Sequence, residues 1–240
     1  MTTSEKPVRD AATVLVVRDT SEGLEVFMVR RHGNSSWLPD VSVFPGGAVD
    51  AADRDAAAHA LLRGSAGEID PAFVVTAARE TFEEVGLLFA DRPIAADALS
   101  DARRALLAGK TTFGAVMEGL GARIDAAQLR FFSRWITPPL ETRRFDARFF
   151  VGRVPRDQVA EADAIEVNEG RWYRPADALA AFERGEIGMI FPTVKHLERI
   201  APYRTVDELM EYAAAKSIAT VQPEYGDGEL MLPAGLADAW

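Results

Sequence analysis

The feature that most constrains this chain is a helix-forming segment that carries three glutamates near its end. Pro71 suits a first helical turn, where its missing N–H needs no partner, and Gly86 is a typical helix stop. Because successive helical residues turn by about 100°, Glu80, Glu83 and Glu84 share one face within one turn. Carboxylates this close repel one another. The segment therefore predicts a helix with either a solvated acidic face or a site for a hard divalent cation.

The overall charge limits the classes of partner. The 240 residues carry a net charge of −10 and no cysteine. An acidic surface repels a phosphate backbone, so we expect no nucleic-acid partner. The longest uncharged stretch, residues 41–49, is far shorter than the roughly 20 residues that cross a bilayer, so we expect no membrane span. The absence of cysteine suits a reducing compartment, and we expect a cytoplasmic protein.

The remaining pattern mixes strands and helices. Residues 14–17 and 26–29 predict an antiparallel pair around a turn at 19–23, and residues 41–44 predict a strand that Pro45-Gly46-Gly47 ends. Further strands are predicted at 129–136, 144–154, 165–167 and 171–173, and further helices at 98–108, before 119, 175–184, 192–201 and 206–216. There is no regular βαβ alternation. This order favours an α+β fold in which helices flank a central mixed β-sheet, an α/β/α sandwich.

The same pattern predicts how the chain is divided. Residues 1–10 are polar and expected to be disordered, and residues 11–216 are expected to form a single domain with a helical insertion at about 95–129. The tail, residues 217–240, is expected either to add an edge strand or to contact a partner subunit.

The glycine turn and the glutamate helix together resemble the Nudix box. That box reads Gly, five residues, Glu, seven residues, then Arg-Glu-aliphatic-x-Glu-Glu-x-Gly-aliphatic, and residues 79–87 match its second half. Counting from Gly47, the box glutamate falls at Asp53, but 25 residues separate Asp53 from Arg79, where the family has seven. The box, residues 47–87, is therefore split, and Asp50 or Asp55 could serve instead of Asp53. Thr81 also replaces an aliphatic residue.

A split box is typical of the Nudix branch that resembles the mammalian peroxisomal coenzyme A diphosphatase. Other segments of the chain are similar to that branch: residues 26–31, 37–39, 43–47, 135–138, 143–150 and 166–172. The resemblance implies the Nudix fold and a metal-dependent hydrolase that cleaves a diphosphate linkage in a nucleoside diphosphate joined to another moiety. It favours coenzyme A or acyl-coenzyme A as the small-molecule substrate and allows a homodimer.

The resemblance also implies roles for the box residues. Glu80, Glu83 and Glu84 would hold Mg²⁺ or Mn²⁺, together with the backbone carbonyl of Gly46. Glu84 and Glu80 are the first candidates, because their side chains project to the same side of the helix. Arg79 would orient these carboxylates through ion pairs, which suits its two-pronged guanidinium group.

The general base in this family often comes from outside the box. Glu166 is the first candidate, because it precedes Trp172 in a segment expected to border the site. Glu169 is the second candidate, and Glu141 and Asp146 are further alternatives.

Four paired arginines are candidates for substrate binding in this acidic chain: Arg30, Arg31, Arg143 and Arg144. If the substrate is coenzyme A, its 3′-phosphate would suit such a guanidinium fork.

Other functions fit part of the pattern. The same box serves ADP-ribose, nucleotide-sugar and NADH diphosphatases, so residues 79–87 do not separate these substrates. A Nudix-like nucleotide-binding regulatory module without catalysis is an alternative from another class. Degenerate members of that kind usually lose box carboxylates, whereas this chain retains Glu80, Glu83 and Glu84. An acidic helical interaction protein would explain the charge but not the Gly-Gly turn.

Overall fold

A nine-stranded mixed sheet is the centre of the molecule. The computed structural model describes residues 7–33, 38–155, 157–162, 167–236 and 240. The main path of the sheet is β10-β3-β2-β1-β8-β7-β11, with β4 paired to β1 and β9 paired to β2. The strands are β1 (Val8–Thr20), β2 (Gly23–Arg31), β3 (Val41–Val43), β4 (Gly46–Ala48), β7 (Leu129–Ile136), β8 (Arg144–Arg153), β9 (Val167–Tyr173), β10 (Gly188–Met189) and β11 (Thr220–Val221).

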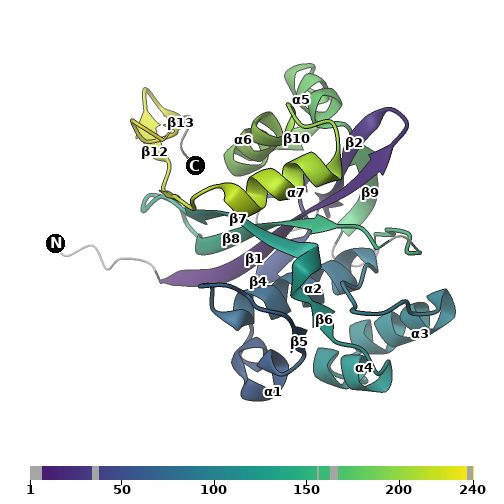
Figure 1. Ribbon diagram of the computed structural model, residues 1–240. Helices are drawn as coiled ribbons and strands as arrows, with labels where there is room; N and C mark the ends of the chain where they lie inside the picture. Colours follow the sequence, from purple (N-terminus) through teal and green to yellow (C-terminus); the bar gives the residue numbers. More distant parts are fainter. Residues whose placement is uncertain (1–6, 34–37, 156, 163–166, 237–239) are drawn as a thin grey trace.

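Helices cover both faces of this sheet (Figure 1). One layer holds α1 (Ala56–His59), α2 (Pro71–Val85), α3 (Ala96–Leu107) and α4 (Phe113–Gly119), and the other holds α5 (Pro175–Glu183), α6 (Phe191–Ile200) and α7 (Val206–Ala215). Two short 3₁₀ turns, η1 (Ala52–Arg54) and η2 (Ala126–Gln128), lie among the connections. The α+β sandwich with a mixed sheet is therefore confirmed. β1 runs antiparallel to β2 but parallel to β8.

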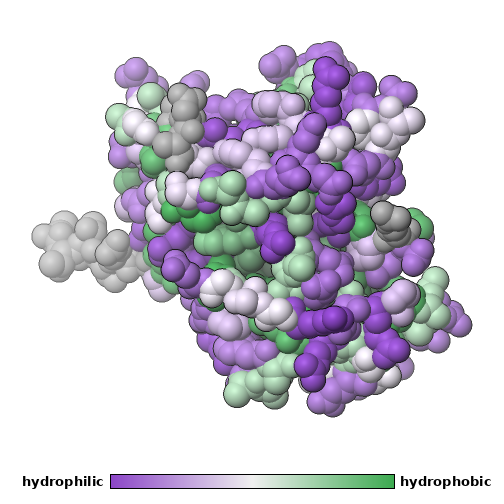
Figure 2. Space-filling view, in the orientation of Figure 1, coloured by the Kyte–Doolittle hydropathy of each residue, from purple (hydrophilic) through white to green (hydrophobic). Residues whose placement is uncertain are grey.

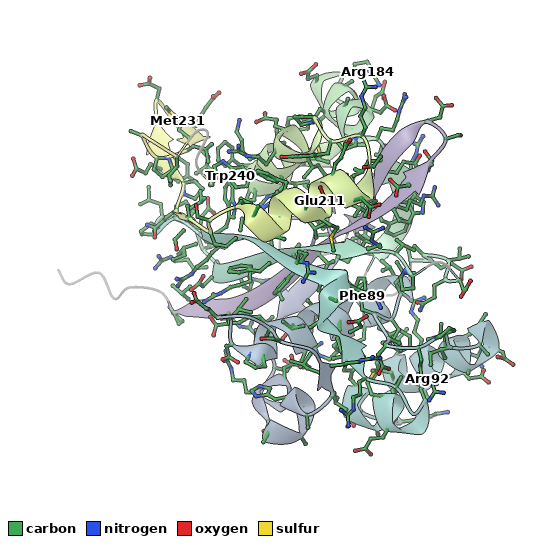
Figure 3. The ribbon with its side chains drawn as sticks, viewed as in Figure 1. Phe89, Arg92, Arg184, Glu211, Met231 and Trp240 are labelled. Atoms are coloured by element: carbon green, nitrogen blue, oxygen red, sulfur yellow. The ribbon has the colours of Figure 1, made fainter. Side chains whose placement is uncertain are left out.

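The alternation of side chains on the central strands builds two separate cores. Val14 and Val16 of β1 face the layer of α2, whereas Leu15 and Val17 face the layer of α6 and α7. All four are fully buried, as expected for a central strand covered on both faces. In Figure 3, Phe89 marks the first core and Trp240 the second. Figure 2 shows polar residues over both helical layers and apolar atoms between them, at the level of the sheet.

Helix α2 begins and ends as its sequence predicts. Asp70 caps it by accepting a hydrogen bond from the backbone N–H of Ala72 (2.9 Å). Gly86 ends it in a left-handed conformation at φ 75°. Thr81, which departs from the aliphatic residue of the family pattern, is fully buried, and its hydroxyl donates to the carbonyl of Ala77 (2.7 Å). This bond lets a polar residue occupy an apolar position.

The two insertions fold together. Strand β5 (Leu62–Arg63), from the segment that splits the box, pairs in parallel with β6 (Ile124–Asp125), which follows α4. The expected helical region at 95–129 is thus helical through Gly119, and its last part forms β6 and η2. The physical cause of this difference is the pairing with residues 62–63. These residues lie far away in the sequence, so the local pattern at 124–125 does not indicate the pairing.

Both ends of the chain add strands. β1 begins at Val8, inside the segment expected to be disordered, because residues 8–10 pair with residues 144–146 of β8. The tail adds β11 to the edge of the sheet beside β7, then forms a hairpin from β12 (Glu224–Gly226) and β13 (Glu229–Met231). The two runs at 165–167 and 171–173 belong, as far as the structure describes them, to the single strand β9. Among the described helices, none has the length and apolar composition that would cross a membrane.

Candidate functional site

The glycine turn brings the backbone against the end of helix α2. β4 pairs with β1, so that Gly46 lies opposite Thr13 and Gly47 opposite Ala12. Gly46 has φ 154°, and a Cβ there would lie 2.3 Å from the carbonyl oxygen of Ala12. A Cβ on Gly47 would lie 2.5 Å from the carboxyl group of Glu80. Only glycine at 47 lets this carboxylate lie directly against the turn.

Arg79 and Asp53 form the fixed centre of the acidic region. Asp53 is 3% exposed and receives two hydrogen bonds from Arg79, at 3.0 Å from Nε and 2.8 Å from Nη2. The hydroxyl of Thr76 (2.9 Å) and the backbone N–H of Asp50 (3.0 Å) also donate to it. The side chain of Asp50 is 66% exposed, and Asp55 is exposed. Asp50 lies 3.7 Å from Nη2 of Arg79 but is largely exposed, so Asp53 is the buried carboxylate among the three aspartates and the one that hydrogen-bonds to Arg79 across the inserted residues.

Arg79 also holds two of the glutamates. Its Nη1 donates to Glu80 (2.8 Å) and to Glu83 (3.0 Å), and its Nη2 donates to the carbonyl of Ala48 (3.1 Å). Burial alone would lower the pKa of Arg79, but the hydrogen bond with Asp53 and the charges of Glu80, Asp53 and Glu83 raise it well above its ordinary value. Arg79 is therefore a permanent cation that pairs with two of the three glutamates.

Glu84 points to the glycine turn. It is 6% exposed, and its Oε2 accepts a hydrogen bond from the backbone N–H of Gly46 (3.0 Å). Glu84 and Glu80 both line the cavity described below, whereas Glu83 is not among its lining residues. Within the described ranges, no three acidic or histidine side chains already converge as a metal site. The donors nevertheless suit a hard cation, since they are carboxylate oxygens beside a turn that only glycine permits.

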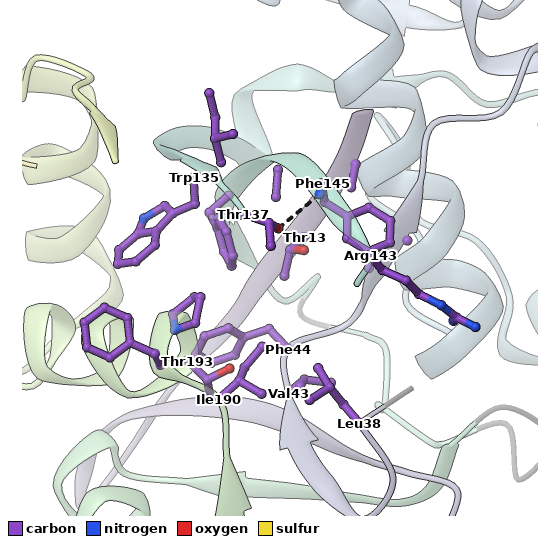
Figure 4. Close-up of a pocket in the computed structure, with 18 of the residues that line it drawn as sticks. Thr13, Leu38, Val43, Phe44, Trp135, Thr137, Arg143, Phe145, Ile190 and Thr193 are labelled. Atoms are coloured by element: carbon purple, nitrogen blue, oxygen red, sulfur yellow. Dashed lines mark hydrogen bonds between the residues drawn. The ribbon is translucent and has the colours of Figure 1, made fainter. Parts of the chain in front are cut away.

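A cleft of about 630 Å³ opens beside these carboxylates. Glu80, Glu84 and the glycine turn form one part of its wall, together with Thr13 of β1. The other lining residues come from β1, β2, β3, β7 and β8, from the connection between β7 and β8, from the loops that flank β3, from the start of α6 and from the tail. In Figure 4, Arg143 and Trp135 lie on opposite sides of this cleft, and the backbone N–H of Phe145 donates to the hydroxyl of Thr137 between them (3.0 Å). A volume of this size suits a small organic ligand.

The four arginine candidates separate into two groups. Arg31 and Arg143 line the cleft, and Arg9, which the sequence analysis did not single out, lines it too. Arg30 is exposed and pairs with Asp40 (3.1 Å). Arg144 is 4% exposed, and its Nε donates to the carbonyl of Thr137 (3.2 Å), so it supports the wall from behind.

The candidates for the general base also differ in position. Glu166, the first candidate, lies outside the described residues. Glu169 is exposed on β9, opposite Arg30 of β2. Burial alone would raise the pKa of Asp146, but hydrogen bonds and charges from Arg134 and Arg148 lower it. Glu141 lines the cleft and accepts a hydrogen bond from the hydroxyl of Tyr225.

The side of the cleft near Trp135 rests on a buried histidine. The ring of His196 stacks on Phe149 with centroids 4.1 Å apart and lies 5.3 Å from the ring of Trp135. Its Nε2 is 2.7 Å from the hydroxyl of Ser133, and its Nδ1 is 2.6 Å from the carbonyl of Pro192. Burial lowers the pKa of His196 to about 3, so the ring is neutral at physiological pH.

Several cleft residues carry no local sequence signal. Arg9 stands in a segment expected to be disordered, and a longer reading of the β1 pattern toward residue 8 would have included it. Phe191, Pro223 and Leu230 reach the cleft only through the packing of α6 and the tail. Their apolar character alone predicts burial in any core.

Comparison with known proteins identifies what this arrangement is similar to. Residues 63–200 match the NUDT19 Nudix domain. The chain is 32% identical to a Nudix hydrolase of known structure from Alicyclobacillus acidocaldarius, with a TM-score of 0.76, and the similarity covers 87% of this chain and 97% of that one.

Curated relatives agree with this match. A putative nudix hydrolase 7 from Caenorhabditis elegans is 25% identical over 93% of this chain and 71% of its own length. The human acyl-coenzyme A diphosphatase NUDT19 is 25% identical over 82% of this chain and 66% of its own length. The chicken protein of the same name is also 25% identical, over 81% of this chain and 65% of its own length. This chain thus spans slightly less than two thirds of the two NUDT19 proteins.

Proposed function

Because this chain belongs to the Nudix hydrolase family and carries a NUDT19 Nudix domain, we propose that it hydrolyses the diphosphate linkage of coenzyme A or acyl-coenzyme A with Mg²⁺ or Mn²⁺. Members of the family are diphosphatases that act on small nucleotide-type substrates, and this chain is such an enzyme. The observation that carries the finer proposal is the cleft itself. It brings Glu80 and Glu84, beside a glycine turn, and three arginines to the lining of one cavity.

The residues at the end of α2 fit a divalent cation, which Nudix hydrolases generally use. Glu80, Glu83, Glu84 and the carbonyl of Gly46 would hold it, with Glu80 and Glu84 nearest the cleft. When bound, such a cation neutralises diphosphate charge and lowers the pKa of water. Arg79 donates hydrogen bonds to Glu80 and Glu83, so these carboxylates stay close together although they repel one another.

Other side chains of the protein would bind the substrate and accept the proton. Arg9, Arg31 and Arg143 line the cleft and would bind phosphate oxygens, which suits their planar guanidinium groups. A carboxylate accepts a proton from the attacking water: Glu166 is our candidate, and Glu141 is the alternative that lines the cleft. Water forms a new P–O bond, the bridging P–O bond breaks, and both products leave as phosphate monoesters.

Coenzyme A is favoured for two reasons. Two of the relatives are named acyl-coenzyme A diphosphatases. A molecule with a diphosphate and a separate 3′-phosphate also matches a cleft that offers carboxylates for a cation and arginines apart from them.

A substrate panel tests this proposal. Coenzyme A, acyl-coenzyme A, ADP-ribose, NADH and nucleoside triphosphates would be incubated with the protein and Mg²⁺ or Mn²⁺, and the products identified by mass. We expect phosphopantetheine, or its acyl form, and adenosine 3′,5′-bisphosphate from the coenzyme A species at the highest kcat/KM. Preferential hydrolysis of ADP-ribose or NADH would contradict the substrate assignment. Inactivity on every compound would favour a nucleotide-binding module without catalysis.

A further inference from the structure

The cleft has an apolar side that the hydrolysis of a diphosphate does not require. Trp135 lies across the cleft from Arg143 (Figure 4), and Phe191 at the start of α6 packs edge-on against it with ring centroids 6.2 Å apart. Pro223 and Leu230 from the tail also line the cleft. Phosphate groups gain nothing from these side chains, since apolar surface binds apolar ligand groups.

The tail that supplies Pro223 and Leu230 is fixed to the rest of the fold on both sides of the hairpin. Before it, Val221 is fully buried and pairs with Trp135 of β7. Beyond it, Trp240 is 2% exposed and packs edge-on against the ring of Trp135, with centroids 4.9 Å apart. The hairpin therefore has a defined place beside the cleft.

A polar contact joins the hairpin to the opposite rim. The hydroxyl of Tyr225 on β12 donates to Glu141, which lies between β7 and β8 and lines the cleft. Leu230 of β13 is the cross-strand partner of Tyr225, so the contact holds the strand pair that presents Leu230. The next residue, Met231, is 53% exposed and does not line the cleft.

We propose that Leu230, with Pro223, Trp135 and Phe191, forms the subsite for the fatty acyl chain of an acyl-coenzyme A, so that the tail hairpin sets the preference for acylated over free coenzyme A. This inference rests on the proposed function, because it assigns one side of the same cleft. The adenine end is a poorer occupant, since its ring nitrogens need hydrogen-bond partners. The four side chains of the subsite are hydrocarbon rings and chains, apart from one indole N–H.

The test compares two neighbouring residues of one strand. Leu230→Asp places a charge in the subsite, whereas Met231→Asp places the same charge on the exposed face of β13 and is the matched control. Both variants and the wild-type protein would be assayed with free, acetyl-, octanoyl- and palmitoyl-coenzyme A, to give kcat/KM for each substrate.

We expect the kcat/KM of the wild-type protein to rise with chain length, since each methylene group removed from water is worth about a factor of four in affinity. Leu230→Asp should reduce the ratio of kcat/KM for palmitoyl- to free coenzyme A by about tenfold, whereas Met231→Asp should keep it within about twofold.

The other outcomes would overturn either the subsite alone or the proposed substrate as well. A flat response of the wild-type protein to chain length, or equal ratios in the two variants, would overturn the acyl subsite and leave the diphosphatase proposal standing. Failure to hydrolyse any member of the series would overturn the proposed substrate and the subsite with it.

Discussion

The two sides of the cleft are held in place by different physical forces. On the carboxylate side, Arg79 joins Asp53, Glu80 and Glu83 through hydrogen bonds of 2.8–3.0 Å. On the apolar side, residues from β7, α6 and the tail meet through ring packing over the neutral His196. The carboxylate side should therefore respond sharply to the loss of one charge, and the apolar side to changes of packing and of pH.

The largest effect is expected at Glu84. Glu84→Gln should lower kcat by about 1,000-fold, or about 4 kcal/mol, because the amide cannot supply the charge that a bound cation needs. The fold should persist, since a neutral amide oxygen still accepts from the N–H of Gly46. Steady-state kinetics with Mg²⁺ measures this, and Glu118→Gln, on the exposed surface of α4, is the control. Near-normal turnover of Glu84→Gln would remove Glu84 from the cation site.

A substitution at Asp53 tests how the site is held in place, independently of its chemistry. Asp53→Asn should lower the free energy of unfolding by about 3 kcal/mol, because it removes the charge of the most buried carboxylate that pairs with Arg79. Urea unfolding measures this change. Asp50→Asn is the control, and it should cost less than about 0.5 kcal/mol because the Asp50 side chain is largely exposed. Equal losses in the two variants would mean that Asp53 is not the buried partner of Arg79.

His196 makes the apolar side sensitive to acid. Its pKa is about 3 in the folded protein and about 6.5 in the unfolded chain, because burial disfavours the charged ring. Below pH 6.5 the unfolded chain binds the extra proton, so stability is present above that pH and is lost as pH falls toward 3. The loss should approach about 1.4 kcal/mol per pH unit.

Unfolding in urea between pH 7 and 5 tests this account. The wild-type protein should lose about 2 kcal/mol over that range, and His196→Gln should lose much less from a lower starting stability. An unchanged slope in His196→Gln would assign the acid sensitivity to other groups.

The smallest effect is expected among the arginines. Arg143→Gln should raise KM for coenzyme A by about tenfold, because it removes a charged fork from the cleft wall. Arg30→Gln should change KM by less than about twofold, since Arg30 pairs with Asp40 away from the cleft. A larger rise in KM for Arg30→Gln than for Arg143→Gln would place the phosphate contact at Arg30 on β2.

The sequence allowed the carboxylate side to be predicted in most respects, because helix α2 keeps its glutamates in a local pattern. Gly47 and Glu80 were both recognised, although 32 residues lie between them. The sequence does not decide which of Asp50, Asp53 and Asp55 takes the place of the box glutamate. That depends on how the inserted residues fold and bring η1 next to Arg79. Geometry decides it, because only Asp53 is buried there.

The apolar side could not be predicted from the sequence. Trp135 and Leu230 are almost a hundred residues apart, and Leu230 reaches the cleft only because β11 pairs with β7 and places the hairpin. Leu230 begins a short apolar run, residues 230–232, whose sequence does not indicate that it reaches a cleft. The position of Arg9 was missed for a related reason, since the parallel pairing of β1 with β8 extends a strand into polar residues.

Direct binding of Mn²⁺ tests the central claim, which is that the carboxylate side holds the cation. Electron paramagnetic resonance would follow free Mn²⁺ during titration with wild-type protein, Glu84→Gln and Glu118→Gln. The account predicts saturable binding to the wild-type protein and Glu118→Gln, and binding weakened at least tenfold in Glu84→Gln. Equal affinity for all three proteins would place the cation elsewhere and contradict the account.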